Sequence, residues 1–177
     1  MANTTFSGPV RSKNGFQSIG PGAVVALTAA TNLTVADHAG RIQTIDPVGT
    51  PTAITLPTIN ATADSAVAGA SDPNNPSTIG TTFEILFIDE FTGTISTDGT
   101  DKFVGSVMVG VDDGSKKAFV PAATNDVVNL NGEAGAGNAT KGGLIGSRIK
   151  FTATADNTYM VEGLLIGDGT IVTPFGN

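Results

Sequence analysis

The stretch Thr82-Phe-Glu-Ile-Leu-Phe-Ile88 indicates the fold more strongly than any other part of this chain. Every second residue from Phe83 to Phe87 is large and apolar, which places these side chains on one face of a β-strand. Leu86 and Ile88 make the other face apolar as well. A strand that is apolar on both faces belongs in the centre of a sandwich or at a contact between subunits. We therefore predict that Phe83 and Phe87 lie in one of these two environments.

Short apolar or alternating runs flank this strand, with turn signals about every 8–12 residues, a spacing typical of all-β sandwiches and barrels. The 92–97 run is expected to form a hairpin with 82–88. In the 147–153 run, Ile149, Phe151 and Ala153 are expected to point inward. The predicted class is all-β, a β-sandwich or barrel-like domain. The other expected strands are 23–28, 33–35, 41–46, 53–56, 103–111, 117–120, 126–130 and 159–166.

The domain organisation follows from where these signals begin and stop. Residues 1–20 lack a sustained apolar period and contain turn signals, so we predict an extended N-terminal arm. Residues 21–177 are predicted to form a single β domain. Within it, residues 58–80 are rich in Ala, Asp, Ser, Asn and Pro, and are predicted to be a surface insertion.

Composition narrows the possible functions. The chain of 177 residues carries a net charge of −7 and contains no cysteine. An acidic chain repels phosphates, so we expect no direct contact with nucleic acid. No apolar run approaches the ~20 residues that span a bilayer, so we expect no membrane partner.

Arg11 and Lys13 give the arm a charge of +2, and the rest of the chain, with seven bases and sixteen acids, has −9. A basic arm on an acidic body indicates either docking onto an acidic surface or a solvated terminus.

Catalytic and metal-binding signals are weak. The single histidine, His38, lies beside Asp37 without a nucleophile elbow, and we interpret it as an ordinary loop residue. The acidic turns near residues 89, 98 and 112 do not have the spacing of a calcium-binding loop. A sugar-cleaving carboxylate pair is disfavoured because the chain has no Trp and one Tyr. We predict no enzyme activity, no cofactor and no metal.

The two ends of the chain resemble a known family. Tyr159-Met-Val-Glu-Gly-Leu-Leu-Ile-Gly-Asp-Gly-Thr-Ile-Val-Thr-Pro-Phe175 predicts a strand, a glycine turn and a short strand that ends on a buried Pro-Phe. This closing segment and the opening segment, residues 1–16, are similar to those of the head decoration, or cement, proteins of tailed phages. The "Ile-Thr-Leu-Pro" at 54–57 is similar to a strand end in the same family.

The resemblance implies a structural protein on the outer capsid surface of the virion, made in the host cytoplasm. It implies a homotrimer that clamps neighbouring subunits of the major capsid protein. Pro174 and Phe175, with Phe83 and Phe87, are then expected to close the core or to meet at the trimer axis. The capsid-binding residues that it implies are Phe6, Pro9, Val10, Arg11, Lys13 and Phe16.

A second hypothesis belongs to the binding class. The chain is then a receptor- or glycan-binding module of a capsid knob or fibre, and loops 60–79 and 131–143 are its candidate binding surfaces. The two hypotheses differ in the expected partner, which is the capsid shell in the first and a host polysaccharide in the second.

Overall fold

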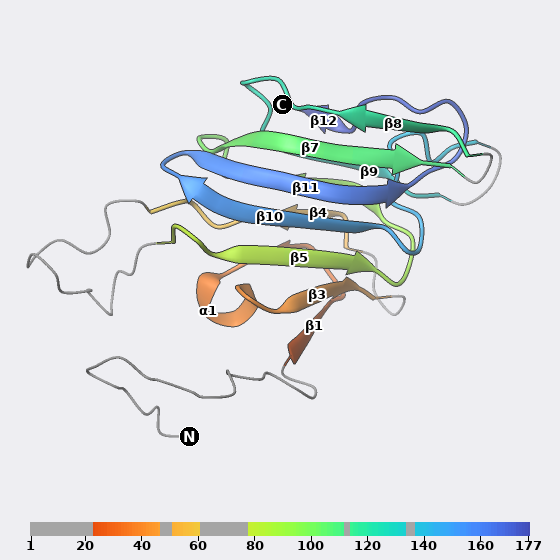
Figure 1. Ribbon diagram of the computed structural model, residues 1–177. Helices are drawn as coiled ribbons and strands as arrows, with labels where there is room; N and C mark the ends of the chain where they lie inside the picture. The colour runs from red at the N-terminus through yellow and green to blue at the C-terminus, as the bar shows by residue number, and fades with distance from the viewer. Residues whose placement is uncertain (1–22, 47–50, 61–77, 112–113, 134–136) are drawn as a thin grey trace, which may run out of the picture.

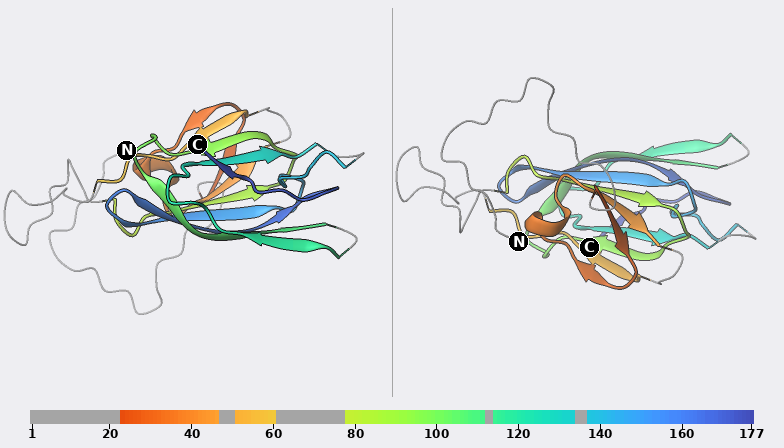
Figure 2. Two further views of the ribbon diagram at one scale, coloured as in Figure 1. Left: turned by 90° about the horizontal axis from the view of Figure 1, so that it is seen from above. Right: turned by 90° about the horizontal axis from the view of Figure 1, so that it is seen from below.

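A computed structural model describes residues 23–46, 51–60, 78–111, 114–133 and 137–177 (Figure 1). The chain forms two β-sheets that pack face to face, and views along the sheet edges show the two layers (Figure 2). The prediction of an all-β fold is confirmed, and its architecture is a sandwich rather than a single closed sheet. The predicted arm, with all six expected capsid-binding residues, lies outside the described residues.

The larger sheet has seven strands and faces the viewer in Figure 1. The second sheet has five strands and lies behind it. The larger sheet contains, in spatial order, β1 (Val24–Leu27), β3 (Ile42–Ile45), β5 (Thr82–Phe87), β10 (Arg148–Ala155), β11 (Thr158–Ile166), β7 (Lys102–Gly110) and β8 (Lys116–Phe119). The second contains β12 (Phe175–Gly176), β9 (Val127–Asn131), β6 (Thr92–Ser96), β4 (Ala53–Thr55) and β2 (Thr31–Asn32). The described helix is α1 (Val35–His38).

The first six strands alternate between the two sheets. As a result β1, β3 and β5 run parallel in the larger sheet, and β2, β4 and β6 run parallel in the second. The later strands complete both sheets. β10 pairs antiparallel with β5 on one side and with β11 on the other. β10 therefore joins the parallel strands of the first half to the C-terminal strands.

The core lies between the two sheets. Phe83, Ile85, Ile149, Phe151 and Ala153 are fully buried, as their alternation predicts. The second sheet contributes its own inward row, in which Ile54, Ile95, Val128 and Phe175 are register neighbours. Burial of these side chains supplies the main stabilisation of the fold, at about 25 cal/mol per Å² of apolar surface.

The predicted hairpin between 82–88 and 92–97 is wrong. β5 pairs with β3 and β10, and β6 belongs to the other sheet, where it pairs with β4 and β9. The connection carries Phe91 into the core, where its ring packs edge-on to Phe87 at a centroid distance of 5.8 Å. A large apolar side chain in a short linker therefore takes the chain across the sandwich instead of turning it back.

The predicted strand at 33–35 is also wrong. Thr34 is the N-cap of the one-turn helix α1, and its hydroxyl accepts a hydrogen bond from the Asp37 N–H at 3.2 Å. Threonine followed three residues later by an acid is a helix-start pattern, which here outweighs the β propensity of the run.

The ends of the predicted insertion meet. The Thr78 N–H donates to the Asn60 carbonyl at 3.1 Å, and the Asn60 N–H donates to the Thr78 hydroxyl at 2.7 Å. The residues between them, 61–77, lie outside the described part of the chain, so the surface position of the insertion stays a prediction. Within the described ranges, no helix has the length and hydrophobicity of a membrane span.

Candidate functional site

The four residues predicted to close the core or meet at a trimer axis are all buried. Phe83 and Phe87 are 0% and 2% exposed between the sheets. Phe175 in β12 is 8% exposed and pairs with Val128, and the adjacent Pro174 carbonyl accepts the Asn129 N–H at 2.7 Å. These are the positions of core side chains, and contact of any of them across a trimer axis stays a prediction.

His38 has a local structural partner. It is the last residue of α1 rather than a loop residue, and its Nδ1 accepts a hydrogen bond from the Thr34 N–H at 3.0 Å. The Thr34 hydroxyl donates to Asp37 Oδ2 at 2.9 Å. The side chains of Thr34, Asp37 and His38 thus form hydrogen bonds that cap the N-terminus of α1, so we assign them a structural role.

The turn between β6 and β7 holds two aspartates in different environments. Asp98 Oδ1 accepts the N–H groups of Thr100 and Asp101, and its Oδ2 accepts the Thr58 hydroxyl at 2.8 Å. Burial raises the pKa of Asp98, but these hydrogen bonds outweigh it, so the pKa lies below its ordinary value.

Asp101 shows the opposite behaviour. Its side chain is fully buried; Oδ2 accepts the Ile59 N–H at 2.9 Å, and Oδ1 has no hydrogen-bond partner. Burial, together with the charges of Asp98 and Asp156, raises the pKa of Asp101. The described residues contain no group of three or more His, Cys, Asp or Glu side chains placed to hold a metal ion.

Three depressions on the described surface are shallow and open. One, of about 300 Å³, is lined by Asp89, Glu90 and Glu133 with Thr92 and Pro51 among its other residues, and another, of about 460 Å³, is lined mainly by 115–117 and 169–171. Neither lining contains an aromatic ring on which a sugar could stack. A third depression, of about 290 Å³, lies on the outer side of the larger sheet.

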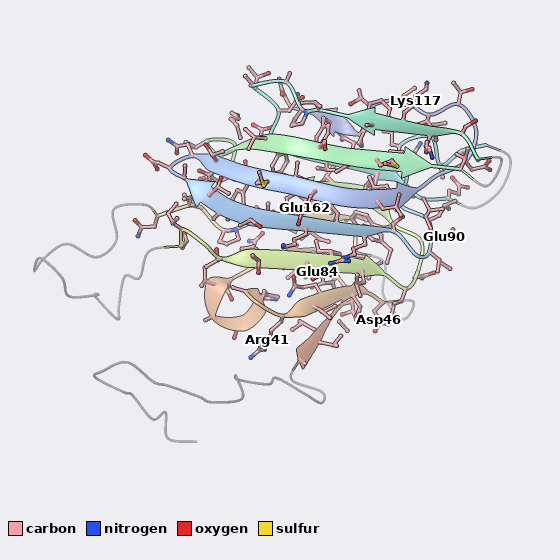
Figure 3. The ribbon with its side chains drawn as sticks, in the orientation of Figure 1. Arg41, Asp46, Glu84, Glu90, Lys117 and Glu162 are labelled. Atoms are coloured by element: carbon pink, nitrogen blue, oxygen red, sulfur yellow. The ribbon has the colours of Figure 1, made fainter. Side chains whose placement is uncertain are left out.

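That outer side is the most distinctive surface of the described chain. Large apolar side chains project outward from its two long neighbouring strands, β7 and β11: Val104, Met108, Met160 and Leu164, which are 42–51% exposed. Beside them, across β5, β10 and β11, lie two ion pairs, Arg148–Glu84 at 2.6 Å and Lys150–Glu162 at 3.1 Å. We call these eight residues, together with the half-buried Leu86 in the same outward row of β5, the contact face. Figure 3 shows Glu84 and Glu162 on this side of the sheet.

Strand register sets the arrangement of the contact face. Leu86, Arg148, Leu164 and Met108 are successive partners across β5, β10, β11 and β7. The next row, two residues along the strands, contains Glu84, Lys150 and Glu162. Each ion pair thus joins neighbouring strands, and the apolar side chains lie above and below the charged row.

Sequence reasoning missed most of this face. The sequence indicates an apolar second side of the 82–88 strand at Leu86 and Ile88, and Ile88 is 51% exposed. The same signal is present in Met160 and Leu164, which occupy outward positions between the buried Tyr159, Val161 and Leu165. Large apolar residues at both alternating positions of one strand are the pattern that would have found the face.

Comparison with known proteins does not add to these observations. No family model matches the chain, and neither a curated protein nor a solved structure matches it.

Proposed function

We propose that this protein is a structural virion protein that binds the outer surface of a phage capsid and stabilises the shell by clamping neighbouring major capsid subunits. The single observation that carries the proposal is the contact face, where four exposed apolar side chains lie beside two ion pairs on a sandwich whose described depressions are open and shallow. This face favours a protein that acts through contacts with other protein chains. Exposed apolar patches of this kind are typical of protein contacts, whereas ligand sites are concave and enclosed.

The resemblance of the two chain ends to phage decoration proteins supplies the identity of the partner. In this proposal the basic arm, with Phe6, Val10 and Phe16 as apolar contacts and Arg11 and Lys13 as charges, binds the capsid protein. The sandwich holds several arms together. Joined arms bind at high effective concentration, so their combined affinity exceeds that of one arm by orders of magnitude. Three copies per clamp, the homotrimer implied by the resemblance, stays a prediction.

Co-sedimentation with expanded capsids that lack decoration protein tests the proposal. We expect the full chain to bind saturably and a chain without residues 1–19 to stay folded but not bind. Reversing the arm charges, in R11E/K13E, should weaken binding, while R41E on the exposed body should not. Equal binding of the full and shortened chains would contradict the anchoring role, and absence of any binding would contradict the function.

The alternative, a receptor- or glycan-binding module, has no specific support among the described residues. Its candidate loop 131–143 is partly described, and Asn131 there is committed to internal bonds with Asn138, Thr140 and Lys141. This alternative would be favoured if the protein binds host polysaccharide and does not bind capsids.

A further inference from the structure

We infer that two copies of this chain pair through their contact faces, related by a two-fold axis that runs parallel to the strands between β10 and β11. The inference goes beyond the proposed function, because it concerns how copies meet and not what the arm binds. It comes from the charge pattern of the face, the symmetry that this pattern permits and the size of the surface.

The centre of the face is electrically neutral on an otherwise acidic molecule. Glu84 and Glu162 are balanced by Arg148 and Lys150, within a chain of net charge −7. Two copies repel each other when most other parts of their surfaces approach, because both carry net negative charge. At this face they meet without a net charge on either side, and the exposed Met and Leu side chains lose contact with water.

The charged row is self-complementary under one two-fold axis. Lys150 of β10 and Glu162 of β11 are register partners on neighbouring strands. A two-fold axis that lies in the interface between these strands exchanges their positions, so Lys150 of each copy faces Glu162 of the other. An in-plane axis perpendicular to the strands would place Lys150 against Lys150. The pattern therefore selects one orientation for a symmetric contact.

The same axis brings the apolar residues together. It sets β5 of one copy opposite β7 of the other, so Leu86 faces Met108, which lies in the same register row. Arg148 faces Leu164, and the aliphatic part of the arginine can cover the leucine while its guanidinium stays near Glu84. No charge is left facing a like charge in these two rows.

The surface approaches the size of a stable contact. Four strands ~4.8 Å apart and about eight residues long, at ~3.3 Å per residue, present roughly 500 Å², and the flanking strands extend this further. A standard protein interface buries about 800 Å² on each partner. Aligned packing of two sheets across such a face is a common arrangement.

Charge reversal across the axis provides the test, with the mass of the full chain measured by light scattering or sedimentation over a range of concentrations. We expect wild type to form a dimer, or a larger assembly built from such pairs. K150E and E162K each place like charges opposite each other twice, so each should weaken the pairing at least about tenfold. The control E133K reverses an exposed charge that follows β9 of the five-stranded sheet, away from the face, and should leave the pairing unchanged.

Mixing the two variants distinguishes a contact between copies from an effect within one copy. K150E is acidic at both positions and E162K is basic at both, so a mixed pair has two favourable contacts. We expect the mixture to form heterodimers at concentrations where each variant alone is mainly monomeric, and the double variant K150E/E162K to regain the wild-type pairing.

A wild-type chain that stays monomeric at all concentrations would overturn the inference. So would a trimer whose mass and stability to dilution do not respond to K150E or E162K, or a mixture that fails to form heterodimers. Pairing is measured by mass and capsid binding by co-sedimentation of the same variants. Loss of one can therefore be distinguished from loss of the other.

Discussion

The two outer faces of the sandwich differ although the two inner faces are alike. Both sheets direct rows of large apolar side chains into a shared core. On the outside, the seven-stranded sheet carries the contact face. The five-stranded sheet instead presents small polar side chains at outward positions of its three central strands, among them Thr55, Thr94, Ser96 and Asn129.

The difference shows which surface is adapted to water and which to a partner. Thr, Ser and Asn hydrate well and suit a strand face in contact with solvent. Met108, Met160 and Leu164 contribute little to the core from their outward positions, so their presence is better explained by a partner than by folding. We therefore expect substitutions of inward residues to change stability and substitutions of the contact face to change association.

The largest expected effect separates inside from outside. Phe87→Ala removes a fully buried ring that packs against Phe91, and should lower the free energy of unfolding by about 3–5 kcal/mol. Leu164→Ala on the contact face, where the side chain is 51% exposed, should cost less than ~1 kcal/mol in the monomer. Urea unfolding at low protein concentration measures both. Similar costs for the two variants would remove the distinction between the faces.

A second prediction concerns the pairing of the two strands that carry the apolar part of the contact face. Gly105 in β7 has φ of +107°, and a Cβ there would lie 2.2 Å from the Val161 carbonyl oxygen of β11. Gly105→Ala should therefore destabilise the fold by about 3 kcal/mol.

Gly110, at the end of the same strand, is the matched control. A Cβ there has no heavy atom within 4 Å, so Gly110→Ala should be close to neutral. Equal thermal midpoints for the two alanine variants would contradict the close approach of β7 and β11.

A smaller effect is expected where the chain crosses from the five-stranded to the seven-stranded sheet. The raised pKa of Asp101 means that its ionised form is penalised in the folded state, so its contribution to stability is present at acidic pH and is lost as the pH rises through the folded pKa. Asp98 has a lowered pKa, and its contribution is lost as the pH falls.

The variants D101N and D98N separate the two contributions. D101N should gain stability relative to wild type as the pH rises from acidic to neutral, and D98N should lose it. Unfolding measured across this pH range checks the signs. A common sign for the two variants would show that Asp101 is not held in a different environment from Asp98.

The smallest expected effect on stability belongs to the charged row. Lys150→Gln removes an ion pair whose side chains are 33% and 59% exposed, and should change the free energy of unfolding by less than ~1 kcal/mol. Thr94→Lys on the polar face of the five-stranded sheet should change neither stability nor association. A large loss of stability in Lys150→Gln would give the contact face a folding role.

Most individual strands could be predicted from local pattern, because alternation reports burial directly. Ile149, Phe151 and Ala153 point inward as expected, and the turn at Asp156 and Asn157 joins β10 to β11, with Asn157 at φ of 55°. Asparagine tolerates this left-handed conformation better than most residues, so the turn was recognisable from sequence.

Strand partners were less predictable, because pairing depends on contacts between distant residues. The hairpin expected for 82–97 was wrong, because no local pattern in those residues predicts that Phe91 is buried in the core. Gln43 gives a second example. It is an inward-facing, fully buried polar residue whose amide nitrogen donates to the carbonyls of His38 and Arg41, a use that depends on the loop before β3.

The place of β10 has a consequence for how the chain folds during synthesis. β5 and β7 belong to the same sheet, but β10 and β11 lie between them, so neither β5 nor β7 has its full set of neighbours until residues 148–166 have left the ribosome. Until then the growing chain exposes two long unpaired strand edges, which are open to wrong pairing with other chains. The larger sheet is therefore complete only after β10 and β11 have taken their places between β5 and β7.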